Sequence, residues 1–174
     1  LTLAPGVTIN NTLGSAVAMT AAKPMTWNSF TFTGSNNLDL GAGAVTLALN
    51  TTVTTTAGTL TAGGTLGDGG NNRSFNKDGA GTLAIGGNVS IGGNLAVTAG
   101  SGTFGGASNT IGGSVTGSGA GLTMSGASTI GSGVSITAGA ASLNGNNNIT
   151  GGVSISTAGA VTLNGDNTIT SGGV

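Results

Sequence analysis

The chain contains no cysteine, no histidine and no tyrosine, and only three basic and four acidic side chains occur among its 174 residues. Without cysteine there is no disulfide and no thiol nucleophile, and without histidine the most common general base and metal ligand are missing. Three basic residues are too few to form a nucleic-acid-binding surface. We therefore expect no catalytic residue, no metal site, no cofactor and no nucleic-acid partner.

The acidic residues offer little for catalysis. A glycosidase needs two carboxylates within about 5–10 Å of each other. Asp68 and Asp78 could approach across a loop, with Arg73 and Lys77 between them. We interpret this segment as a solvated loop with weak ion pairs, and we expect that the chain is not an enzyme. A polysaccharide-active enzyme is the remote alternative, and it would need these side chains gathered in a groove.

Long apolar runs are also missing. No stretch approaches 18 consecutive apolar residues, so we expect no membrane span. The chain begins with Leu1 and no basic-plus-apolar leader opens it, which we interpret as a mature segment or a fragment. A free soluble monomer usually carries many more surface charges. The low charge therefore favours a segment that is packed in an assembly, embedded in a longer molecule or glycosylated.

The abundant feature of the sequence is a short repeated motif. Isoleucine recurs at a nearly constant spacing, within similar polar and glycine-rich surroundings, at Ile91, Ile111, Ile130, Ile149 and Ile169. A fixed period of this length is typical of a solenoid, in which each repeat forms one coil stacked on the next.

Alternation with period 2 predicts the strands within each coil, and glycine pairs between them predict the corners. The segment 139–158 reads as one coil with three short strands and three turns. Stacked coils give a roughly triangular, all-β, right-handed parallel β-helix of about nine rungs, each of roughly 19–20 residues. The apolar columns are Leu122/Met124, Leu143 and Leu163; the isoleucines; and Val115, Val134, Val153 and Val174. Asn144 and Asn164 are expected to stack at one corner.

We interpret 1–174 as a single solenoid segment, with irregular rungs in 1–78 and regular rungs in 79–174. The side chains expected to point inward in the irregular part are Val7, Ile9, Val17, Met19, Phe30, Phe32, Leu38, Leu40, Val45, Leu47, Leu49, Leu60 and Leu66. Trp27 with Phe30 and Phe32 is expected to fill a wide part of the core rather than to form a carbohydrate-binding platform.

Two stretches resemble a known family. Lys77-Asp-Gly79-Ala-Gly81-Thr82-Leu83-Ala-Ile85 is similar to the K-x-G-x-G-T-L-x-L opening of the autotransporter-associated β-strand repeat. The segment 159–174 is similar to the continuation of that repeat, except that Ile169 replaces the usual tyrosine. The resemblance implies a secreted, right-handed β-helical passenger of bacterial surface proteins, often adhesive or fibrous. It supplies no catalytic residues.

The two ends of the chain match each other. Reading from Val174 onto Leu1 completes one full rung, and Val7-Thr8-Ile9-Asn10 then resembles Val161-Thr162-Leu163-Asn164. Neither end shows a polar cap, which a solitary solenoid requires. We therefore predict uncapped ends that stack head to tail on further copies, as separate subunits or in tandem. The residues predicted for this assembly interface are Leu1, Leu3, Val7, Ile9, Val161, Leu163, Ile169 and Val174.

The sequence thus predicts a structural segment of an extracellular bacterial fibre or giant surface protein, located at the cell surface. The alternative is the stalk of an adhesin that binds glycans or cell surfaces, with the loops in 23–32 or 67–78 as binding regions.

Overall fold

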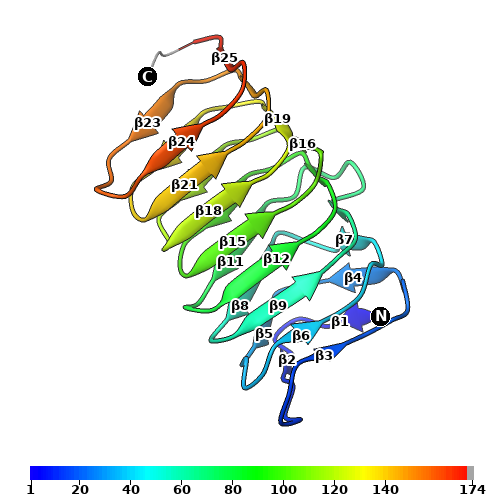
Figure 1. Ribbon diagram of the computed structural model, residues 1–174. Coiled ribbons are helices and arrows are strands. Elements are labelled where there is room, and N and C mark those ends of the chain that lie inside the picture. Colours follow the sequence, from blue (N-terminus) through cyan, green and yellow to red (C-terminus); the bar gives the residue numbers. More distant parts are fainter. Residues whose placement is uncertain (172–174) are drawn as a thin grey trace.

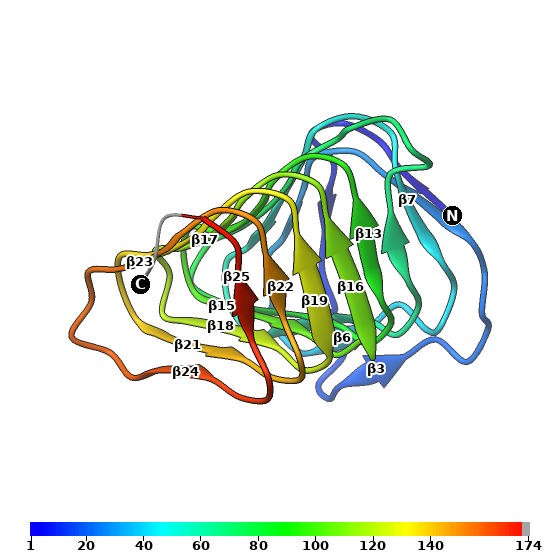
Figure 2. The same ribbon diagram turned by 90° about the horizontal axis from the view of Figure 1, so that it is seen from above.

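The computed structural model describes residues 1–171, which form a parallel β-solenoid. Within these residues the chain contains 25 short strands and no helix. The strands are stacked in three sheets, and the chain visits the sheets in a fixed order, so that every neighbouring pair is parallel and lies one turn apart (Figure 1). Seen from above, the turns wind around a shared interior (Figure 2). The expected all-β solenoid is confirmed.

Sheet A consists of β1 (Thr2–Leu3), β4 (Met25–Trp27), β7 (Val45–Leu47), β10 (Leu66–Gly67), β13 (Val89–Ile91), β16 (Ser108–Ile111), β19 (Ala127–Ile130), β22 (Asn148–Ile149) and β25 (Thr168–Ile169). Sheet B consists of β2 (Thr8–Ile9), β5 (Phe30–Phe32), β8 (Thr51–Thr55), β11 (Phe75–Asp78), β14 (Leu95–Val97), β17 (Val115–Gly117), β20 (Val134–Ile136) and β23 (Val153–Ile155). Sheet C consists of β3 (Val17–Ala18), β6 (Leu38–Asp39), β9 (Thr59–Ala62), β12 (Thr82–Ile85), β15 (Ser101–Phe104), β18 (Gly121–Met124), β21 (Ala140–Leu143) and β24 (Val161–Leu163).

The solenoid has about eight turns, not the nine that a uniform period predicted. In sheet A the paired positions run Thr2, Thr26, Thr46, Gly67, Ser90, Thr110, Thr129, Asn148 and Thr168. The longest steps in this series lead from β1 to β4 and from β10 to β13. These two turns include the loops at 10–16, 19–24 and 68–74, and the extra loop residues reduce the number of turns.

The core is built from columns of like side chains, as the sequence predicted. Five isoleucines pair in sheet A in register from Ile91 to Ile169. Val115, Val134 and Val153 align in sheet B, while Val174 lies outside the described residues. Met124, Leu143 and Leu163 align in sheet C. Each turn therefore adds one layer to a continuous apolar interior.

The N-terminal turns enclose the large aromatic side chains. Trp27, Phe30 and Phe32 are buried, and the rings of Trp27 and Phe30 meet edge to face with centroids 5.2 Å apart. The expectation that this cluster fills the core is therefore confirmed. Two other inward assignments are wrong, because Met19 and Leu49 are exposed. Each follows the end of a short strand, at Ala18 and Leu47, so period-2 alternation no longer applies to it.

Glycines at the corners let the backbones of successive turns come into direct contact. At the corner between sheets B and C, Gly100 has a φ of 60°, and a Cβ there would overlap the carbonyl oxygens of Gly79 and Gly81 in the previous turn. Gly139 repeats this arrangement against Gly119 and Ala120 two turns later. The high glycine content is thus a requirement of stacking as well as of turning.

Candidate assembly interface

Within residues 1–171, both ends of the solenoid present strand edges that no other described strand pairs with. The edge strands are β1 and β25 in sheet A, β2 and β23 in sheet B, and β3 and β24 in sheet C. Strands β1 and β25 lie at opposite ends of the stack (Figure 1). An unpaired parallel edge exposes N–H and C=O groups that can pair with another strand.

The predicted interface residues fall at these two ends. Leu3 is buried in β1, whereas Val7 and Ile9 are partly buried and pack against the core from the first turn. At the opposite end the partly buried residues are Val161, Leu163 and Ile169. Leu1 is half exposed, and Val174 lies outside the described residues. The equivalent columns in the middle of the solenoid are almost fully buried, so each end has incompletely covered core side chains.

Apart from Leu49, the exposed large apolar side chains of the described residues lie in the first and last turns. Leu1, Leu13 and Met19 of the first turn are 52%, 63% and 46% exposed, and Ile155 in β23 is 43% exposed. Its neighbour one turn below, Ile136, is 1% exposed. Ile136 lies between β17 and β23, whereas Ile155 has a described neighbouring strand on one side only, so the difference in exposure does not come from a change of residue type.

An asparagine ladder reaches the C-terminal end. The Asn164 side-chain amide donates to the Asn144 side-chain oxygen over 2.6 Å, which confirms the predicted stack. Three residues later in each turn, the Asn147 side-chain amide donates to the Asn167 side-chain oxygen over 2.7 Å. These contacts join turns through side chains as well as through the backbone.

Lys77, which we predicted to lie in a solvated loop, occupies a core position. It aligns with Val53 and Val97 in sheet B, and its side chain is fully buried. Its ammonium group donates to the carbonyl oxygens of Asp78, Gly79 and Ala99 over 2.9, 2.6 and 2.9 Å. Burial lowers the pKa of Lys77 from its ordinary 10.5 to about 8, while the nearby Asp78 carboxylate raises it by less.

Asp68 is likewise buried rather than solvated. Its carboxylate accepts hydrogen bonds from the backbone N–H groups of Gly70, Arg73 and Gly92 over 2.8, 2.9 and 2.8 Å. Burial alone would raise the pKa of Asp68, but these backbone hydrogen bonds outweigh it and hold the pKa below the usual value of 3.8. The expectation of a solvated loop with weak ion pairs is therefore wrong at Lys77 and at Asp68, since both form local structure.

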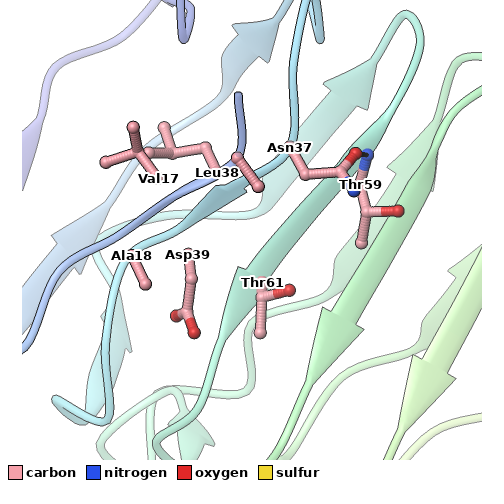
Figure 3. A pocket seen from close by; sticks show the side chains of 8 residues that line it. Val17, Ala18, Asn37, Leu38, Asp39, Thr59 and Thr61 are labelled. Carbon is pink, nitrogen blue, oxygen red and sulfur yellow. Dashed lines mark hydrogen bonds between the residues drawn. The ribbon is translucent and has the colours of Figure 1, made fainter. Parts of the chain in front are cut away.

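A hollow lies on the outside of sheet C near its N-terminal edge (Figure 3). It has a volume of about 220 Å³, and its lining comes from β3, β6 and β9. Its one carboxylate, Asp39, already accepts a hydrogen bond from the Gly41 N–H over 2.7 Å. Asn37 similarly accepts from the Thr59 N–H over 2.9 Å. Both side chains thus form hydrogen bonds within the solenoid.

Taken together, the fold and its ends define a three-sheet parallel β-solenoid with open edges. Comparisons with protein-family models, with curated proteins and with solved structures found no match. In the described residues no group of three or more potential acidic, histidine or cysteine ligands could hold a metal ion. Nor do residues 1–171 include a helix long and apolar enough to cross a membrane.

Proposed function

We propose that this chain is a structural β-solenoid segment of an extracellular bacterial fibre or giant surface protein, extended end to end by further segments of the same kind. The observation that supports this most strongly concerns both ends of the described residues 1–171, where each sheet has an edge strand with no described neighbour on one side and the apolar columns are only partly covered. The resemblance to autotransporter-associated repeats favours the bacterial surface as the location.

The composition of the edge strands favours further pairing, although β1, β2, β3 and β25 are each only two residues long. Soluble proteins usually protect an edge with lysine, proline or a bulge. None of the six edge strands contains a charged side chain or a proline. Each added turn would supply a ladder of backbone hydrogen bonds and a new layer of apolar core, so that length grows at constant cross-section.

End-to-end stacking predicts association that a charge at one end prevents. Small-angle X-ray scattering of the chain at rising concentration should show rods that lengthen while their cross-sectional radius stays constant. Val161→Lys places a charge in the partly buried edge strand β24, and we expect it to shift the scattering towards single segments. Thr123→Lys adds the same charge on the outward side of β18, two strands inward from the β24 edge, and should assemble as the original chain does.

A scattering curve that stays that of one segment at all concentrations, with Val161→Lys indistinguishable from the original chain, would count against stacking of separate copies. Equal loss of assembly in Val161→Lys and Thr123→Lys would show association through the sides rather than through the ends.

A further inference from the structure

The number of strands fixes how two segments can join without a gap. Within residues 1–171 the chain runs repeatedly through sheets A, B and C in that order, and the first and last described strands, β1 and β25, both belong to sheet A. The next strand of a continuous solenoid therefore belongs over β23 in sheet B. A second copy, however, begins with a sheet A strand.

Two alignments are then possible. If the copies keep their faces aligned, β1 stacks on β25, and the positions above β23 and β24 are skipped, so sheets B and C each lose one strand at the junction. If the second copy is rotated by one third of a turn, β1 stacks on β23, β2 on β24 and β3 on β25. Only the rotated alignment continues all three hydrogen-bond ladders, and unpaired buried backbone groups are costly.

The residues of the meeting strands fit the rotated alignment. Strand β2 with its flanking residues reads Val7-Thr8-Ile9-Asn10, and β24 with its next residue reads Val161-Thr162-Leu163-Asn164. Stacking these strands places apolar residues inward, threonines outward, and Asn10 above Asn164, where the ladder from Asn144 continues. Strand β23 is followed by Ser156 and offers no such position.

The partly covered apolar side chains also find partners. In this alignment Leu1 and Leu3 of the second copy lie over Val153 and Ile155, and Val17 lies over Ile169. Because the six strands that meet carry no charge, no like-charge contact opposes the junction.

We propose that the partner of each open end is a second copy of this chain rotated by one third of a turn about the solenoid axis, so that sheet B of one copy continues as sheet A of the next. This inference rests on the end-to-end stacking proposed above. Each copy then adds eight and one third turns to the fibre, or about 40 Å at about 4.8 Å per turn. After three copies the rotation is complete, and the sheets again face the same directions.

Because the chain has no cysteine of its own, every disulfide in an engineered pair must join the introduced cysteines. Opposed residues on neighbouring strands lie within the Cα separation of about 4.4–6.8 Å that a disulfide needs. A copy with Thr162→Cys in β24 is mixed with a copy that carries Thr8→Cys in β2, and the mixture is oxidised. The matched control pairs Ser154→Cys in β23 with the same Thr8→Cys in β2. A third pair, Thr168→Cys in β25 with Thr2→Cys in β1, reports the alignment in which the faces of the two copies coincide. All these side chains are exposed and point outward.

We expect dimers from the first pair in at least tenfold excess over the other two. A predominance of dimers from either of the other pairs would overturn the inference while leaving end-to-end stacking intact. If the predominant pair is Thr168→Cys with Thr2→Cys, the copies meet with aligned faces.

A direct tandem of two copies tests the alignment even where separate copies do not associate. In it, six residues of sequence separate Ile169 of β25 from Thr2 of the next β1, within the two to seven residues that separate a sheet A strand from the following sheet B strand elsewhere. The rotated alignment predicts an internal disulfide between Thr162→Cys of the first copy and Thr8→Cys of the second. An internal disulfide between Ser154→Cys and Thr8→Cys, or none in either tandem, would contradict it. Failure of separate copies to associate would count only against their assembly as subunits.

Discussion

At the scale of single residues, the two buried charges serve the solenoid rather than a reaction. The ammonium of Lys77 and the carboxylate of Asp68 each meet three backbone groups at places where the coil changes direction. Buried charges are stable only when hydrogen bonds replace their hydration. Both side chains therefore hold backbone groups that adjacent strands do not pair.

Lys77 predicts a stability that rises in alkaline solution. Between pH 8 and 10.5 the unfolded chain keeps the lysine proton while the folded chain releases it, so the unfolded state binds more protons and the free energy of unfolding increases with pH. From pH 7.5 to 10 the original chain should gain roughly 1–2 kcal/mol relative to Lys77→Met. Denaturant titrations followed by the fluorescence of Trp27 measure this difference.

The absence of tyrosine leaves few other groups that titrate in this range, and Lys23→Met is the matched exposed control. Equal pH profiles for the original chain and Lys77→Met would show that Lys77 titrates as an ordinary exposed lysine.

Asp68 predicts the opposite dependence in acid. Because its folded pKa is below 3.8, its contribution is present above about pH 4 and is lost as the pH falls through the folded pKa. Asp68→Asn replaces an acceptor oxygen by an amide that faces N–H donors, so it should lower the free energy of unfolding at pH 7 by about 1–3 kcal/mol. Thermal unfolding at pH 7 and pH 3 should show this deficit shrinking in acid. Asp166→Asn, at an exposed side chain, should have little effect at either pH.

At the scale of elements, short strands stack closely because glycines at many of the corners let the backbones of successive turns meet. The strands are two to five residues long, so the turns determine how closely the coils approach. Side chains at these corners would separate neighbouring coils, and glycine avoids this.

Gly100 tests the role of the corners. Gly100→Ala introduces a Cβ into the carbonyl oxygens of the previous turn and also requires a left-handed φ of 60°. We expect a loss of about 2 kcal/mol or more in the free energy of unfolding. Gly14→Ala is the control, because Gly14 has ordinary φ and no atom within 4 Å of its Cβ position. A similar loss in both variants would indicate that close stacking is not what Gly100 provides.

The regular turns were predictable from sequence because one residue pattern recurs on every coil. The isoleucine, valine and leucine columns and the Asn144–Asn164 contact follow directly from that period. The prediction failed where strands ended early, at Met19 and Leu49, and where charge was equated with exposure, at Lys77. Alternation with Phe75, two residues earlier, was the signal that places Lys77 inward. The carbonyl groups that receive its ammonium come partly from the next turn, and a single strand does not reveal them.

At the scale of the whole molecule, the solenoid has a direction, because all neighbouring strands in its three sheets are parallel. In residues 1–171 each sheet has an edge strand at both ends, and the sequence has a formal net charge of only −1. The mechanical role proposed here follows from this continuity, because a load along the axis would be shared by three hydrogen-bond ladders at every level.

Electron cryomicroscopy of filaments formed by the purified chain tests the central claim most directly. We predict unbranched filaments of constant cross-section, with strands stacked about 4.8 Å apart through every junction and one copy about every 40 Å. Discrete particles one segment long at all concentrations, or filaments with a break in the strand spacing at each junction, would contradict it.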